Sequence, residues 1–239
     1  EYFAYSGVDP VTGLPTGLQS TGPAYSTNNE YGQAKDANTV SAQGIKPTYQ
    51  DEMTLGIEKA HLCGLSMGGL TGLWLAAYHG ERFPRMVVSN TAALIGTQQS
   101  WNTRIAQVEQ GGMASVTETV LERWFTQGYR DAAPGRVDIV KAMLLSTPDA
   151  GYNGNCGAIR DADLRAQLPN IRVPMLVIGG THDISTPAAQ TKLIADGVPG
   201  AQYVELSAGH LANWEQADGY TEALVSFLTT GVAREAAHG

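Results

Sequence analysis

The sequence is poor in cysteine, in basic residues and in long apolar stretches, and each shortage excludes a class of protein. Two cysteines, Cys63 and Cys156, cannot build a disulfide framework. We therefore expect both to be small core residues, and we expect the protein to be located in the reducing cytoplasm. The 15 Lys and Arg residues are outnumbered by 23 Asp and Glu residues, and no basic block stands out. We therefore expect no nucleic-acid partner. No apolar run has the length of a membrane span and no signal-peptide pattern opens the chain, so we expect no membrane partner.

Residues 1–50 have few Leu, Ile or Val and are rich in Gly, Ser, Thr, Asn, Pro and Tyr. They show no apolar period of two or of 3.6, so we expect this region to be the least regular, with few strands. The composition changes near residue 55, which sets residues 1–54 apart as an atypical polar segment. A chain of 239 residues suits one domain, with room for an insertion.

Beyond that boundary, short apolar runs alternate with helical patterns. The strands are expected at 59–66, 85–92, 173–181 and 201–208. The expected helices are 67–80, with apolar spacing at Leu70, Leu73, Trp74 and Ala77, one from Pro187, and a last one carrying Tyr220, Leu224, Phe227 and Leu228 on one face. Residues 98–168 lack strand signals and are expected to be mostly helical. This alternation predicts an α/β fold with a mostly parallel sheet flanked by helices.

The motif G-x-S-x-G stands at "GLSMG", where the first expected strand meets the first expected helix. That context is the one a nucleophilic serine needs, because a sharp turn lifts Ser66 above the sheet. The backbone N–H of Met67, at the helix N-terminus, would then face a developing oxyanion. The alternative is a serine at an ordinary glycine-rich turn, since the motif is common by chance.

A nucleophilic serine needs a base, and the base needs an orienting carboxylate. Asp183 follows the strongest expected strand and His210 follows the last one, at the carboxyl ends where sites form in open α/β sheets. The order Ser, acid, His is the order of α/β hydrolases. His182 and Ser185 are weaker alternatives because neither lies on the required turn, and His61 is expected to be a buried histidine within its strand.

The sequence resembles the α/β hydrolase family and, within it, the 3-oxoadipate enol-lactonases of the beta-ketoadipate pathway. Residues 55–230 carry the resemblance, above all "RWFT" and "GYNGNCGAIRDADLR" in the insertion. It implies an α/β hydrolase core at 55–94 and 169–239, a helical cap insertion at 95–168, and a triad of Ser66, Asp183 and His210.

By the same resemblance, the substrate is a small-molecule enol-lactone with a carboxylate arm, opened through an acyl-enzyme to 3-oxoadipate. No metal or cofactor is needed, and no His, Cys and Asp cluster has ligand spacing. The carboxylate calls for a local cation, for which Arg123 and Arg160 are the candidates, with a salt-bridged or solvent-facing arginine as the alternative for each. Trp124 would line the pocket or anchor the cap.

Residues 1–50 depart from the family pattern, because no small-residue loop that could supply a second oxyanion N–H follows a strand there. Three functions therefore stay open: an enol-lactonase, a general carboxylesterase on the same scaffold, and a non-catalytic α/β-hydrolase-fold protein with an incomplete oxyanion hole. The sequence does not decide the oligomeric state.

Overall fold

The computed structural model describes residues 3–4, 7–8, 15–16, 19–20 and 59–233. The chain forms two compact units, Glu1–Leu55 and Gly56–Gly239. In the first, β1 (Phe3–Ala4) pairs with β4 (Gln19–Ser20) and β2 (Gly7–Val8) with β3 (Pro15–Thr16), both antiparallel. Most of residues 1–50 lies outside the described residues. The expectations of little regular structure and of a missing second oxyanion N–H both concern this segment.

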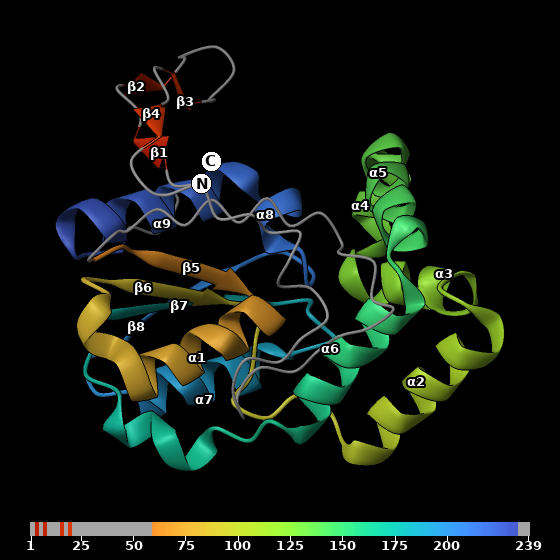
Figure 1. The fold of residues 1–239 in the computed structure, drawn as a ribbon, viewed down its shortest axis with the longest axis horizontal. Helices are drawn as coiled ribbons and strands as arrows, with labels where there is room; N and C mark the ends of the chain where they lie inside the picture. Colours follow the sequence, from red (N-terminus) through yellow and green to blue (C-terminus); the bar gives the residue numbers. More distant parts are fainter. Residues whose placement is uncertain (1–2, 5–6, 9–14, 17–18, 21–58, 234–239) are drawn as a thin grey trace. The chain divides into compact units, whose positions relative to one another are not determined.

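The second unit is built on a parallel sheet of order β5-β6-β7-β8 (Figure 1). Its strands are Leu62–Leu65, Met86–Ser89, Met175–Gly180 and Gln202–Leu206. Every residue of β6 and β7 is buried, as expected of central strands covered on both faces. All four expected strands are thus confirmed, each trimmed by a few residues at its ends.

Helices cover both faces of this sheet (Figure 1). On one face, α1 (Met67–His79) packs on β5 and β6 and α7 (Ala188–Gly197) packs on β7. On the other face, α9 (Ala217–Thr230) packs on β7 and β8, following the short α8 (Ala212–Glu215). Two 3₁₀ helices, η2 (Gly80–Arg82) and η3 (Arg165–Asn170), complete the connections.

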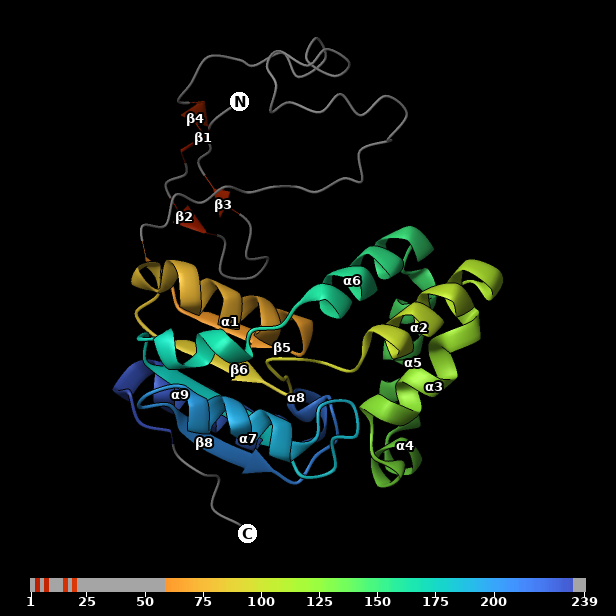
Figure 2. The ribbon, with the colours of Figure 1, turned by 90° about the horizontal axis from the view of Figure 1, so that it is seen from below.

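Between β6 and β7 the chain inserts five helices, here called the helical insertion. They are α2 (Gln98–Gly111), α3 (Ala114–Trp124), α4 (Gln127–Ala132), α5 (Pro134–Ser146) and α6 (Asp149–Asp161). They have an apolar cluster of their own, centred on Val108, Val120 and Phe125. Figure 2 shows them gathered beyond the carboxyl ends of the strands.

Two expectations about burial, those for Trp74 and Cys63, need correction. Helix α1 buries Leu70, Leu73 and Ala76, whereas Trp74 is 46% exposed, because the helix turns it away from the sheet. Cys156 is buried, but Cys63 is exposed on β5, the outermost strand of the described sheet. The residues of α9 behave as expected: Tyr220 and Phe227 are buried, with Leu224 and Leu228 packed against the same cluster. Within the described residues, no helix has both the length and the apolar character needed to cross a membrane.

Candidate active site

Ser66 lies on the sharp turn between β5 and α1. Its backbone is in the left-handed region, with φ 54° and ψ −115°, and its side chain makes no capping bond to the helix it precedes. The turn needs a glycine on the strand side, because a Cβ on Gly64 would lie 2.2 Å from the carbonyl oxygen of Gly68. Ser66 is therefore held in a strained conformation that frees its hydroxyl for another partner.

That partner is His210, in the loop between β8 and α8. The hydroxyl oxygen of Ser66 lies 2.9 Å from His210 Nε2, and His210 Nδ1 lies 2.8 Å from Oδ2 of Asp183. His210 is 2% exposed and Asp183 is 4% exposed, while Ser66 is half-buried. The structure thus joins the three predicted side chains, from the ends of β5, β7 and β8, in one continuous chain of hydrogen bonds.

The carboxylate of Asp183 is fully engaged. Oδ1 accepts the backbone N–H groups of Ser185 (2.8 Å) and Thr186 (2.9 Å), while Oδ2 accepts the Thr186 hydroxyl (2.8 Å) and the Asn90 amide (3.2 Å) as well as His210. Burial acts to raise the pKa of Asp183. The hydrogen bond and the charge of His210, together with the hydrogen bonds from Thr186 and Asn90, outweigh burial and hold this pKa below its usual value. The group is consequently an anion beside a histidine, the arrangement that fixes one imidazole tautomer.

Sequence reasoning missed two of these partners, Asn90 and Thr186. Asn90 is wholly buried, has a φ of 45°, and directs its amide NH₂ to both Asp183 and the carbonyl oxygen of Gly209 (3.2 Å each). Asn90 directly follows β6. Its place at the carboxyl end of a strand, the reason for predicting Asp183, therefore indicates Asn90 as well. Thr186 lies three residues after Asp183, the spacing of a local turn that a carboxylate can cap.

Met67, the residue predicted to offer its N–H to an oxyanion, is the first residue of α1. An N–H at that position has no partner within its own helix, so it is available to a bound ligand. Gly68 is exposed, and a Cβ there would meet nothing within 4 Å, so the space over the start of the helix is open among the described residues.

The two arginines predicted to bind substrate are engaged elsewhere. Arg160 binds the carboxylate of Asp161 through Nε (2.7 Å) and Nη2 (2.8 Å), and also the side chain of Asn102 (2.9 Å). Arg123 is exposed and donates to the carbonyl oxygen of Ile184 at 3.0 Å. Arg104 in α2, half-buried, donates to the Tyr152 hydroxyl at 3.2 Å.

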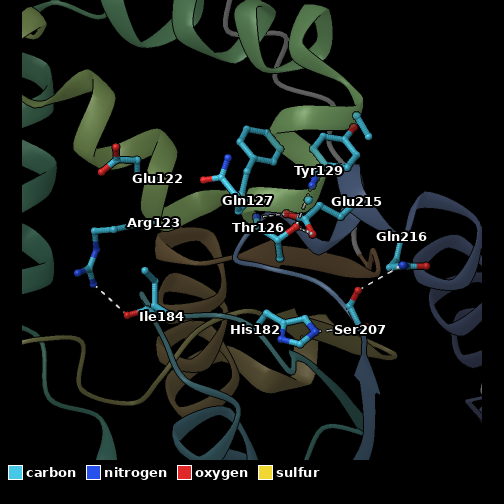
Figure 3. A pocket seen from close by; sticks show the side chains of 13 residues that line it. Glu122, Arg123, Thr126, Gln127, Tyr129, His182, Ile184, Ser207, Glu215 and Gln216 are labelled. Atoms are coloured by element: carbon cyan, nitrogen blue, oxygen red, sulfur yellow. Dashed lines mark hydrogen bonds between the residues drawn. The ribbon is translucent and has the colours of Figure 1, made fainter.

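Arg123 also lines an open cavity of about 690 Å³ between the end of α3, α4 and the loops after β7 and β8 (Figure 3). His182 and Ile184, the neighbours of Asp183 in sequence, are among its walls, but Ser66, Asp183 and His210 are not. The cavity is therefore a separate hollow beside the three joined residues. Trp124 is half-buried, and its ring centroid lies 6.2 Å from that of His210.

The side chains of the remaining alternatives are not part of this chain of hydrogen bonds. His182 is exposed, with Nε2 3.4 Å from the Ser207 hydroxyl, and Ser185 serves Asp183 through its backbone. His61 is exposed just before β5, contrary to the buried position expected of it. In residues 59–233, no three His, Cys, Asp or Glu side chains gather as metal ligands do.

The chain belongs to the α/β hydrolase fold family, whose model matches residues 50–217. Among its relatives, 3-oxoadipate enol-lactonase 2 of Acinetobacter baylyi is 38% identical over 174 residues, which cover 73% of this chain and 65% of the relative. The 3-oxoadipate enol-lactonase 1 of the same organism is 33% identical over 199 residues, covering 83% and 75%. The crystal structure of the enol-lactonase from Burkholderia xenovorans LB400 is 45% identical, with a TM-score of 0.71, covering 72% of this chain and 66% of that one.

The chain thus spans just under two thirds of the length of the first relative and of that solved structure. The match in sequence and in fold places it beside enol-lactonases, which is the resemblance that the insertion segments "RWFT" and "GYNGNCGAIRDADLR" indicate.

Proposed function

We propose that this chain hydrolyses a lactone through an acyl-enzyme on Ser66, and that the substrate is 3-oxoadipate enol-lactone. The observation that carries the proposal is the unbroken relay from the Ser66 hydroxyl to His210 Nε2 and from His210 Nδ1 to Asp183. The similarity to 3-oxoadipate enol-lactonases supports the choice of substrate, and with it a place in the breakdown of aromatic compounds.

In the first half of the reaction, Ser66 Oγ attacks the lactone carbonyl while His210 Nε2 takes its proton. Asp183 stabilises the imidazolium that forms, and the N–H of Met67 faces the oxyanion. The ring C–O bond then breaks, and the departing enol oxygen receives the proton from His210. The enol then tautomerises to a ketone, which makes the ring opening favourable.

In the second half, water attacks the ester carbonyl of the acyl-enzyme and gives a proton to His210. The tetrahedral adduct collapses, Ser66 recovers its proton from His210, and 3-oxoadipate leaves. The helical insertion acts as a cap over this site, in keeping with its place beyond the carboxyl ends of the strands (Figure 2). The substrate carboxylate is bound by an arginine of this cap.

The proposal is tested with a fluorophosphonate probe and two substrates. Wild type should be labelled on Ser66, Ser66→Ala should not, and wild type should turn over the enol-lactone faster than p-nitrophenyl acetate. Labelling with faster turnover of the aryl acetate would instead identify a general carboxylesterase. A folded wild type that is neither labelled nor active would identify a non-catalytic member of the fold.

A further inference from the structure

Glu215, the last residue of α8, binds both Thr126, 89 positions away in sequence, and the loop that carries His210. Its Oε1 accepts the backbone N–H of Thr126 at 2.6 Å, and its Oε2 accepts the Thr126 hydroxyl at 3.0 Å and the backbone N–H of Gly209 at 3.1 Å. Thr126 belongs to the helical insertion, whereas Gly209 directly precedes His210. Figure 3 shows the carboxylate of Glu215 directed at Thr126.

The same junction is closed by the backbone on the other side of His210. The N–H of Leu211 donates to the carbonyl oxygen of Trp124 at 3.1 Å. The fit leaves no room at Gly209, where a Cβ would lie 3.0 Å from Glu215 Oε1 and 3.0 Å from the Trp124 carbonyl oxygen. Both neighbours of His210 are therefore tied to residues 124–126.

The carboxylate of Glu215 is well suited to this junction because it has two charged acceptor oxygens. It serves two backbone N–H groups and a hydroxyl at once, and a charged acceptor forms stronger hydrogen bonds than a neutral one. Without it, the N–H groups of Thr126 and of the buried Gly209 would lose their acceptor. The loop that carries His210 would then be tied to residues 124–126 on one side only, through Leu211.

We propose that Glu215 is a positioning residue, whose carboxylate holds the His210 loop against segment 124–126 and so keeps Nε2 in line with Ser66. The proposal rests on the role of His210 as the base in the proposed function. Its consequence is that removing the carboxylate lowers the rate of the chemical steps more than it weakens substrate binding. A displacement of about 1 Å in a reacting group costs up to about 100-fold in rate.

The decisive variant is Glu215→Gln, because glutamine keeps the shape but has one acceptor oxygen where glutamate has two. It can accept from the N–H of Thr126 or from that of Gly209, but not from both. With p-nitrophenyl acetate, we expect kcat to fall about 10- to 100-fold while KM stays within about threefold. The rate of fluorophosphonate labelling at Ser66 should fall in parallel.

Matched controls separate positioning from loss of charge and from loss of fold. Glu222→Gln removes a carboxylate from an exposed position of α9 and should behave as wild type. Thr126→Ser keeps the hydroxyl and should also behave as wild type, whereas Thr126→Val loses it and should lower kcat less than Glu215→Ala does. All variants are compared well below their unfolding midpoints, so that the folded fraction is the same.

The outcomes distinguish this inference from the function on which it rests. A labelled, active wild type with a Glu215→Gln variant of equal kcat, or one changed only in KM, would overturn the inference and leave the function standing. If Glu215→Ala does not fold, Glu215→Gln decides in the same way. A wild type that is neither labelled nor active would overturn both.

Discussion

Two residues of the described chain, Ser66 and Asn90, hold a positive φ that residues with a Cβ rarely adopt. Such a conformation costs about 1–3 kcal/mol and persists only where the surroundings enforce it. One of them presents the hydroxyl that meets His210, and the other presents the amide that meets Asp183. At the scale of single residues, backbone strain is thus concentrated where the hydrogen-bonded relay is built.

Asp183→Asn is expected to be among the most damaging single changes. An amide in that place would favour the wrong imidazole tautomer of His210, and the corresponding change in serine proteases costs about 10⁴-fold in kcat. The rate of fluorophosphonate labelling measures the effect. Asp196→Asn, at an exposed ion pair with Lys192, is the matched control and should be neutral. Labelling of Asp183→Asn within tenfold of wild type would reduce Asp183 to a cap of the turn at residues 185–186.

The recognition of the substrate carboxylate is tested by Ala substitutions of three arginines. A charge-assisted hydrogen bond is worth about 1.5–3 kcal/mol, so the variant that lacks the binder should lose about 10- to 150-fold in kcat/KM on the lactone acid and keep its rate on the methyl ester. Arg104 is the most favourable position, because it is half-buried and donates to a neutral hydroxyl, that of Tyr152, whereas Arg160 already binds the Asp161 carboxylate and Arg123 is exposed. If all three variants keep the preference for the acid, the anion is bound by another group.

The sequence predicts a site residue where a known motif, or a position directly after a strand, calls for that type of residue. Ser66 is marked by its glycines, and Asp183 and His210 by their places after strands. Glu215 has no such mark, because its role depends on a contact with Thr126, 89 positions away. The engagement of Arg123 by a carbonyl of another loop is hidden from sequence for the same reason.

At the scale of elements, the turn between β5 and α1 gives a matched pair of substitutions. Gly64→Ala would place a methyl group 2.2 Å from the Gly68 carbonyl, so it should lower the free energy of unfolding by about 1–3 kcal/mol or more. Gly68→Ala would add its methyl group in open space and should change stability by less than about 1 kcal/mol. Urea denaturation measures both. Equal effects would mean that the close approach at Gly64 does not govern this turn.

The elements themselves follow from the sequence wherever the apolar period is strong. The central strands β6 and β7 are buried throughout, so their apolar runs stand out from the polar loops. The face of α1 is less predictable, because Trp74 is apolar by type and yet lies 46% exposed. The helical insertion is foreseen only as helical, since its packing depends on contacts such as those of α2 with α6.

At the scale of the whole molecule, the depressed pKa of Asp183 links stability to pH. An unfolded aspartate titrates near pH 3.9, and the folded carboxyl titrates lower because His210, Thr186 and Asn90 stabilise its anion. Its contribution to stability is therefore fully present above about pH 4 and is lost as pH falls through the folded-state pKa. Urea unfolding between pH 2 and 7 should show wild type losing more stability below pH 4 than Asp183→Asn. Identical slopes would contradict the depressed pKa.

Ser66, Asp183 and His210 follow three different strands, and β6 lies between the first two of these strands. The hydroxyl meets the imidazole only in molecules where all four strands stand side by side. A covalent label on Ser66 therefore counts the molecules in which this sheet has formed. The moles of label bound per mole of chain give the properly assembled fraction of a preparation, a number that spectra averaged over every molecule in the cuvette do not report.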